Sequence, residues 1–128
     1  MTKTKTKTLS DIVYEIRLAE VEAELQSVTG FIGEGYDDLV EKAYSALKKC
    51  IADNIRPGSA ELFLGKLAWT GKYEQALALM EPEHAKHVFG QMIADYSTAK
   101  SYDQVRTVVE VLKKAGIQEV YEYTKDDQ

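Results

Sequence analysis

A helix formed by residues 60–70 would be apolar around almost its whole circumference. At about 100° per residue, the apolar side chains of this segment surround the helix axis: Leu62, Phe63, Leu64, Leu67, Ala68 and Trp69. Only Glu61, Gly65 and Lys66 interrupt them. Such a helix must be covered on more than one side, by neighbouring helices or by neighbours and a ligand. The fold must therefore bring further helices against this segment.

Apolar residues also recur at spacings of three and four on either side of this segment. This period predicts helices, and glycine, proline and serine mark their ends. The further helices cover about residues 11–28, 36–52, 73–80, 82–99 and 101–115. Connections of a few residues imply antiparallel neighbours. We therefore expect an all-α chain of about six helices in three stacked antiparallel hairpins, with no strand.

Local signals define the helix ends more closely. Ser10 and Ser59 are predicted N-caps, and Ser101 forms a predicted capping box with Gln104. Gly116 follows the last apolar stripe, where a left-handed residue stops a helix.

The first helix is expected to face the core with its apolar residues, while its glutamates face solvent. These apolar residues are Ile12, Ile16, Ala19 and Ala23, with Val13, Val21, Leu25 and Val28 beside them. Phe31 and Ile32 follow in a glycine-containing loop and are predicted to fold back onto the core.

Composition limits the classes of partner. The chain has 16 basic and 21 acidic residues and a formal charge of −5, which argues against nucleic acid and favours a protein partner. The single Cys50 cannot form an internal disulfide and fits a buried thiol in a reducing compartment. No apolar run approaches the roughly 20 residues that cross a bilayer, and the start lacks a secretory pattern. We expect a cytoplasmic protein without a membrane partner.

The expected domain organisation is a solvated basic tail over residues 1–9, one helical domain over 10–117, and a tail over 118–128. Whether the last segment packs onto the domain or frays is left open.

The sequence contains no convincing catalytic or metal-binding pattern. His84 and His87 share a helix face, but zinc sites usually need three or four ligands, and no further histidine or second cysteine is present. Neither a dinucleotide-binding nor a phosphate-binding glycine motif occurs. We therefore predict a protein that is not an enzyme and uses no metal or cofactor.

Three similar joints precede helices along the chain: Gly35-Tyr36-Asp37, Gly71-Lys72-Tyr73-Glu74 and Lys100-Ser101-Tyr102-Asp103. Their tyrosines are 37 and 29 residues apart, which brackets the period of about 34 in helix-turn-helix arrays. Residues 60–80 resemble a tetratricopeptide unit, with Gly71, Tyr73 and Ala76 at its turn and second helix. Pro82 shortens that helix, and the third joint lacks glycine.

The order of segments from Phe31-Ile32-Gly33-Glu34-Gly35 to the run 67–77 is similar to the small tetratricopeptide-like chaperones of the type III secretion needle subunit. That resemblance implies cytoplasmic capture of an aggregation-prone amphipathic helix in a concave groove. Residues 93–117 and 55–58 also resemble pentatricopeptide units, which implies binding of RNA, one base per repeat. The acidic charge balance argues against the second implication.

The tetratricopeptide resemblance implies an inner face formed by the first helix of each hairpin. Its residues would be Glu61, Gly65, Ala68 and Trp69, followed by His87, Gly90, Ala94 and Ser97. The small residues would let a partner helix or peptide approach closely, with Trp69 as its anchor. Two alternatives stay open: the small residues only permit tight packing within the chain, or apolar helix faces pair copies into a homo-oligomer.

Overall fold

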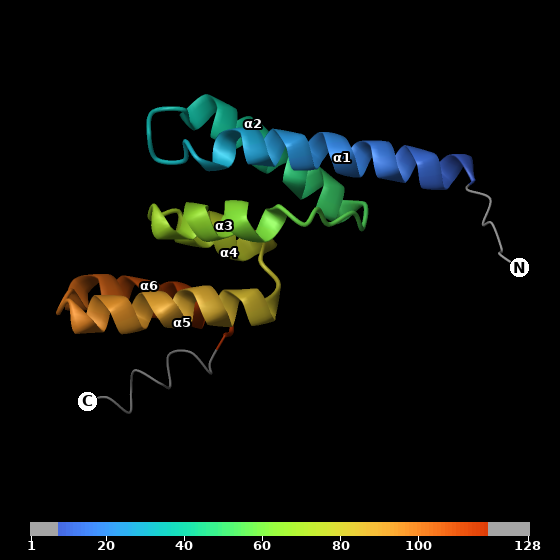
Figure 1. Cartoon of the computed structure of the whole chain (residues 1–128). Helices are drawn as coiled ribbons and strands as arrows, with labels where there is room; N and C mark the ends of the chain where they lie inside the picture. The colour runs from blue at the N-terminus through green and yellow to red at the C-terminus, as the bar shows by residue number, and fades with distance from the viewer. Residues whose placement is uncertain (1–7, 118–128) are drawn as a thin grey trace, which may run out of the picture. The chain divides into compact units, whose positions relative to one another are not determined.

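A computed structural model describes residues 8–117, and within that range it contains six α-helices and no strand (Figure 1). The helices are α1 (Leu9–Thr29), α2 (Asp37–Ala52), α3 (Ala60–Trp69), α4 (Tyr73–Leu79), α5 (Pro82–Thr98) and α6 (Tyr102–Lys114). The all-α prediction is confirmed, and the predicted helix ends agree within two residues. No helix among the described residues is both long and apolar enough to span a membrane.

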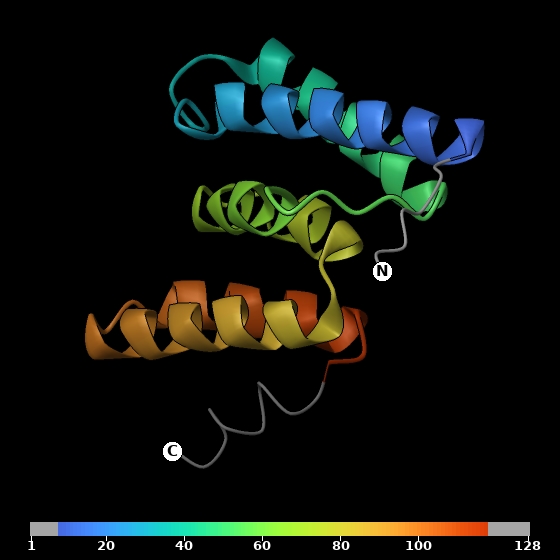
Figure 2. The ribbon, with the colours of Figure 1, turned by 45° about the vertical axis from the view of Figure 1, so that its right-hand side comes forward.

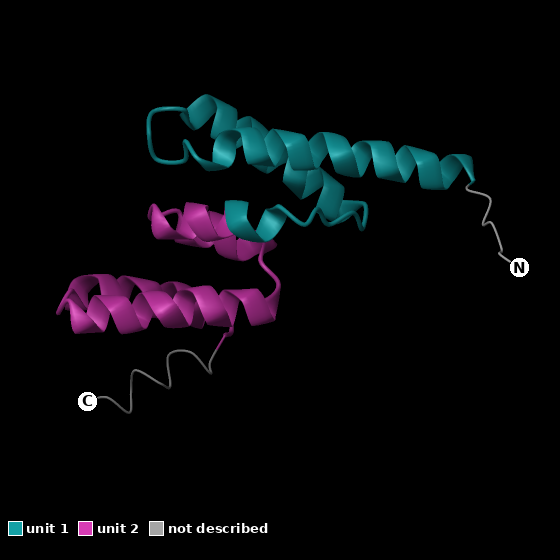
Figure 3. Ribbon diagram, in the orientation of Figure 1, with its two compact units in different colours: residues 1–63 teal, residues 64–128 magenta. Residues whose placement is uncertain are grey.

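The chain divides into two compact units, Met1–Phe63 and Leu64–Gln128 (Figure 3). The predicted tail over residues 118–128 and the first seven residues of the predicted N-terminal tail lie outside the described part. Thr8 and Leu9, by contrast, form the start of α1. The expected stacking of three hairpins in one domain stays a prediction.

In the first unit, α1 and α2 pack as a hairpin. Its apolar core contains Val21, Leu25, Val28, Ile32, Val40, Ala43 and Leu47. Ile32 therefore folds back onto the core as predicted, but Phe31 does not, because 46% of its side chain is exposed.

The prediction for the core face of α1 is confirmed for Val21, Leu25 and Val28 and is wrong for the other apolar residues. Ile12, Ile16, Ala19 and Ala23 are exposed, and the buried residues of α1 start at Val21. The reason is rotational: the buried Val21, Leu25 and Val28 lie on one face of α1, and the four exposed residues lie on another.

In the second unit, α5 packs against α6, and both views show the two helices side by side (Figures 1 and 2). The core of this pair contains Ala85, Val88, Phe89, Met92, Ile93, Val108 and Leu112. Helix α4 contacts α6, and a shallow hollow of about 220 Å³ lies between them. Leu77 and Ala78 line it from α4, and Val111 and Ala115 from the end of α6.

Four helices end in the same hydrogen-bonded turn. In each, an amide donates to the carbonyl five residues earlier, across a residue with positive φ. The pairs are Ile55 to Cys50 (2.8 Å), Lys72 to Leu67 (3.1 Å), Ser101 to Tyr96 (2.8 Å) and Ile117 to Leu112 (3.0 Å). The left-handed residues are Asn54, Gly71, Lys100 and Gly116. The predicted stop at Gly116 is confirmed, and Lys100 occupies the place of the glycine that the third joint lacks.

The helix starts differ from the predicted caps. Thr8, not Ser10, caps α1: its hydroxyl accepts from the amide of Asp11 at 3.1 Å, and Asp11 accepts in return from the Thr8 amide. Ser59 precedes α3, but its hydroxyl has no hydrogen-bond partner among the described residues. Ser101 takes the N-cap position of α6 without a side-chain bond, so its predicted capping box does not form.

Candidate functional site

Helices α3 and α5 carry the eight residues predicted to bind a partner. On α3, Glu61 and Trp69 are exposed and Gly65 is half-buried. On α5, His87 is exposed, while Gly90, Ala94 and Ser97 are half-buried. Ala68 is the exception, because none of its surface is exposed. Its methyl group belongs to the core side of α3, and we remove it from the candidate site.

The two glycines of this surface do not serve tight packing between helices. A Cβ atom added to Gly65 or to Gly90 would meet no neighbouring atom within 4 Å. A glycine that allows close helix packing would instead place a neighbour at contact distance from that position. Within the described residues, the open space therefore argues against the alternative that these glycines only serve internal packing.

Trp69 packs against one aromatic neighbour and is partly exposed to solvent. Its ring packs edge-on against Tyr96 of α5, with ring centroids 5.9 Å apart and an interplanar angle of 67°. Even so, 42% of its surface remains exposed. Aromatic pairs in this geometry contribute about 0.5–1.5 kcal/mol beyond their area burial. The contact with Tyr96 therefore restrains the indole orientation while leaving much of its surface accessible.

A second aromatic contact continues from Tyr96 into the core. The ring of Tyr73, the first residue of α4, packs edge-on against Phe89 with centroids 6.2 Å apart. Burial and a hydrogen bond with Tyr96 raise the pKa of Tyr73 to about 12. The aromatic cluster, defined as Trp69, Tyr73, Phe89 and Tyr96, thus links α3, α4 and α5 within the second unit.

Sequence reasoning did not place Tyr73 and Tyr96 at this site. Tyr73 was expected only as a residue of the repeated joint, and Tyr96 only as one of the residues in the predicted helix over 82–99. The spacing of seven residues between Phe89 and Tyr96 puts both on one face of α5. That spacing is the signal that could have assigned both to one cluster.

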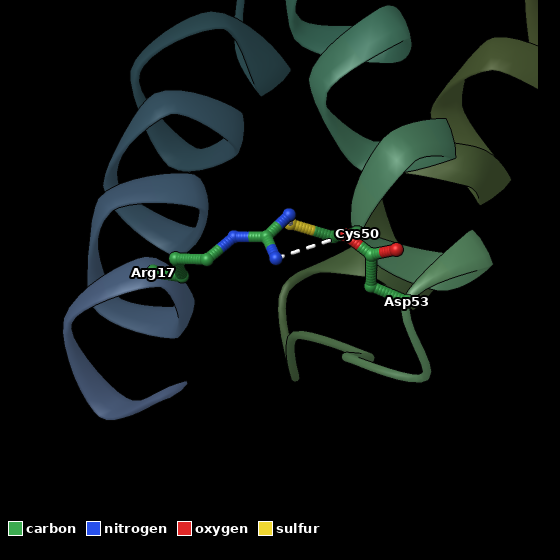
Figure 4. A network of polar contacts seen from close by, with 3 residues as sticks. All are labelled: Arg17, Cys50 and Asp53. Carbon is green, nitrogen blue, oxygen red and sulfur yellow. Dashed lines mark hydrogen bonds and ion pairs between the residues drawn. The ribbon is translucent and has the colours of Figure 1, made fainter. Parts of the chain in front are cut away.

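The single cysteine of the chain belongs to the first unit. Cys50 is buried, as predicted for a structural thiol. Arg17 of α1 donates one hydrogen bond to Asp53 at 2.9 Å and another to the Cys50 sulfur at 3.8 Å (Figure 4). The bond to Asp53 raises the pKa of Arg17. These contacts join α1 to the end of α2.

Among the described residues, no third ligand joins the histidine pair. His84 is half-buried and His87 is exposed. Between residues 8 and 117, no three side chains of histidine, cysteine, aspartate or glutamate gather in an arrangement that could hold a metal ion.

Comparison of the chain with protein-family models, with curated proteins and with solved structures gives no match.

Proposed function

We propose that this chain is a protein-binding module, and that the surface around Trp69 holds a helix or peptide of a partner protein. The observation that carries the proposal is the state of Trp69, whose indole is oriented by Tyr96 and still 42% exposed. Tryptophan is among the residues that most often dominate binding energy at protein interfaces. An indole that is already restrained loses less conformational entropy when a partner covers it.

The glycines define what kind of group can approach. Gly65 lies one turn before Trp69 on α3, and the space above both Gly65 and Gly90 is open. Where no side chain projects, a partner backbone can come close to the helix surface. This favours an extended peptide or the small-residue face of an amphipathic helix as the bound segment.

The fold supports a wider version of this proposal. The turns at Gly71 and Lys100 occupy equivalent places, α3 to α4 and α5 to α6, and share the hydrogen-bonding pattern that also ends α2 and α6. We therefore propose a tetratricopeptide-like adaptor or chaperone, with the needle-subunit chaperones of type III secretion as the class to test first. Its cargo would be an amphipathic helix that aggregates when left alone.

Affinity capture from an extract of the source cells, with mass spectrometry of the bound proteins, tests the proposal. We expect one or a few proteins to bind the unmodified chain and to be lost with Trp69→Ala. Tyr102→Ala is the matched control, because Tyr102 is an aromatic residue of the second unit that is 54% exposed and outside the site. The control should retain the same proteins.

Gly65→Gln provides a second variant that leaves the indole in place. A glutamine side chain would fill the open space above Gly65 without removing the contact between Trp69 and Tyr96. It should release the same partner as Trp69→Ala does. Retention of every captured protein by both folded variants contradicts the proposal. Unfolding of Trp69→Ala, judged by circular dichroism, together with full capture by Gly65→Gln, would make Trp69 a core residue.

A further inference from the structure

The first half of α1 carries an apolar face that no described residue covers. Leu9 is 76% exposed, Ile12 42%, Val13 49% and Ile16 51%. These four positions follow the spacing of one helix face. The stripe continues along α1 through Ala19 and Ala23, which are also exposed. Large exposed apolar patches on a protein surface usually mark an interaction site.

This face leads to a pocket at the other end of the same helix. Steps of four and three residues from Leu9 give one line along α1: Leu9, Val13, Ile16, Glu20, Ala23 and Ser27. Ser27 lines a pocket of about 190 Å³, together with Glu24, Val28, Phe31, Tyr36, Leu39 and Lys42. At 1.5 Å per residue, the line is about 27 Å long. The stripe and the pocket therefore form one continuous surface on the first unit.

The pocket has the size and lining for one apolar side chain. Engineered apolar cavities of about 150 Å³ bind benzene, so about 190 Å³ accommodates a leucine or phenylalanine side chain. Three of its lining residues are large and about half exposed: Phe31, Tyr36 and Leu39. The rings of Phe31 and Tyr36 touch, with centroids 4.8 Å apart, and form one wall.

Charge identifies the kind of occupant. Of the five acidic residues of α1, Asp11, Glu15 and Glu22 lie on the opposite side of the helix from this line at 100° per residue, so the carboxylates that bear on this face are those of Glu20 and Glu24. Arg17 pairs with Asp53. Glu20 lies on the line itself, between the apolar stripe and the pocket, and Glu24 lines the pocket together with Lys42 of α2. The surface thus has two carboxylates and one ammonium group, a net negative charge. A helix that covers this face must bring basic residues against these carboxylates.

A second copy of the chain meets this requirement poorly. If two α1 helices paired antiparallel with Leu9 at the partner's pocket, the two Glu20 residues would lie about 6 Å apart along the axis. Parallel pairing would place them directly opposite each other. Either arrangement brings carboxylate against carboxylate in a surface from which water is being removed, which is unfavourable.

We propose that the α1 face, from Leu9 to the pocket at Ser27, binds a basic amphipathic helix of a partner protein. The bound helix has at least five turns, an apolar stripe against Leu9 to Ile16, and lysine or arginine opposite Glu20 and Glu24. A large apolar side chain near one end enters the pocket. This surface lies on the first unit and does not depend on the function proposed for Trp69.

A pair of synthetic peptides tests the proposal on the full chain. Both have about 21 residues, enough for about 30 Å of helix, with one leucine stripe. One carries lysine at all flanking positions, and the other carries glutamate there. Fluorescence anisotropy of the labelled peptides should show that the lysine peptide binds about tenfold or more tightly than the glutamate peptide, a difference of about 1.4 kcal/mol.

Variants of the chain locate the binding. Ile16→Ser removes an exposed apolar side chain that the bound peptide would bury, and it should weaken binding of the lysine peptide about tenfold. Tyr102→Ser is the matched control for removal of an exposed apolar residue and should not change binding. The pair Glu20→Lys and Glu24→Lys should reverse the preference to the glutamate peptide. Trp69→Ala should leave both affinities unchanged, which separates this surface from the one at Trp69.

Three results would overturn the proposal. Equal affinity for the two peptides would show that the face does not select a basic helix. Full binding by Ile16→Ser would place the peptide elsewhere. Sedimentation of the chain alone as a dimer that Ile16→Ser dissociates would show that a second copy occupies the face. Circular dichroism of each variant confirms that the helices are intact.

Discussion

The open space above Gly65 and Gly90 predicts that alanine at these positions stabilises the protein. Both glycines lie inside helices, α3 and α5, where glycine costs about 0.8–1.0 kcal/mol relative to alanine. An added Cβ meets nothing within 4 Å at either position, so no steric cost offsets this gain. Each substitution should raise the free energy of unfolding by about 1 kcal/mol, and the double variant by about 2 kcal/mol if the two sites are independent.

Urea and thermal denaturation, followed by circular dichroism at 222 nm, measure this change. With an unfolding entropy of about 2.1 cal/mol/K per residue, 2 kcal/mol corresponds to an increase in Tm of about 7 °C for a chain of this length. Gly71→Ala is the matched control, because Gly71 has φ +98. Alanine in that left-handed region should lower the free energy of unfolding by about 1–2 kcal/mol.

A loss of stability in Gly65→Ala or Gly90→Ala would refute the reasoning, because it would mean that a neighbouring group fills the space. The glycines would then serve packing within the chain, and the argument for close approach of a partner would fail with them. The proposed function adds a second requirement. The same variants should be more stable and yet hold the captured partner less tightly, because each added methyl group keeps the partner backbone farther from the helix.

Two further predictions concern single residues of the second unit. Lys100 has φ 60 in the turn after α5, so Lys100→Gly should raise the free energy of unfolding by about 0.5–1 kcal/mol in urea denaturation; a lower value would show that the lysine side chain stabilises the turn. Burial raises the pKa of Tyr73 from its ordinary value of 10.0 to about 12, so the folded state holds the phenol proton more strongly than the unfolded state. The stabilisation of the folded state by the protonated phenol is present below pH 10 and is lost as pH rises towards 12. The free energy of unfolding of Tyr73→Phe should therefore fall less steeply than that of the unmodified chain across this range. Parallel pH profiles would contradict the raised pKa.

The positions of the helices could be predicted from local sequence because local chemistry decides them. Pro82 and Gly71 stop or start a helix whatever surrounds them, and the apolar period between such residues is read directly. The left-handed turn at Lys100 could not be predicted in this way. Lysine has no preference for positive φ, and the turn is imposed by the bond from Ser101 to Tyr96 and by the packing of α5 on α6.

The candidate site could be predicted only in part, because a helix that is apolar on all sides does not indicate which side faces solvent. Ala68 and Trp69 are neighbours on α3, yet one is fully buried and the other is 42% exposed. Successive residues differ by about 100° around a helix, so the arrangement of neighbours decides which of the two faces solvent. Composition identifies tryptophan as a candidate anchor, whereas only the fold shows that Tyr96 supports it.

The core face of α1 was also predicted only in part. Apolar residues follow two separate lines along it, one through Val21, Leu25 and Val28, and one through Leu9, Val13 and Ile16. A single amphipathic helix is recognised from one apolar stripe opposite a polar face, and two stripes were therefore read as one broad core face. The structure buries only the first line. The second line is retained at the cost of exposed apolar area, which favours aggregation, and a partner helix that covers it is the physical reason we propose for its presence.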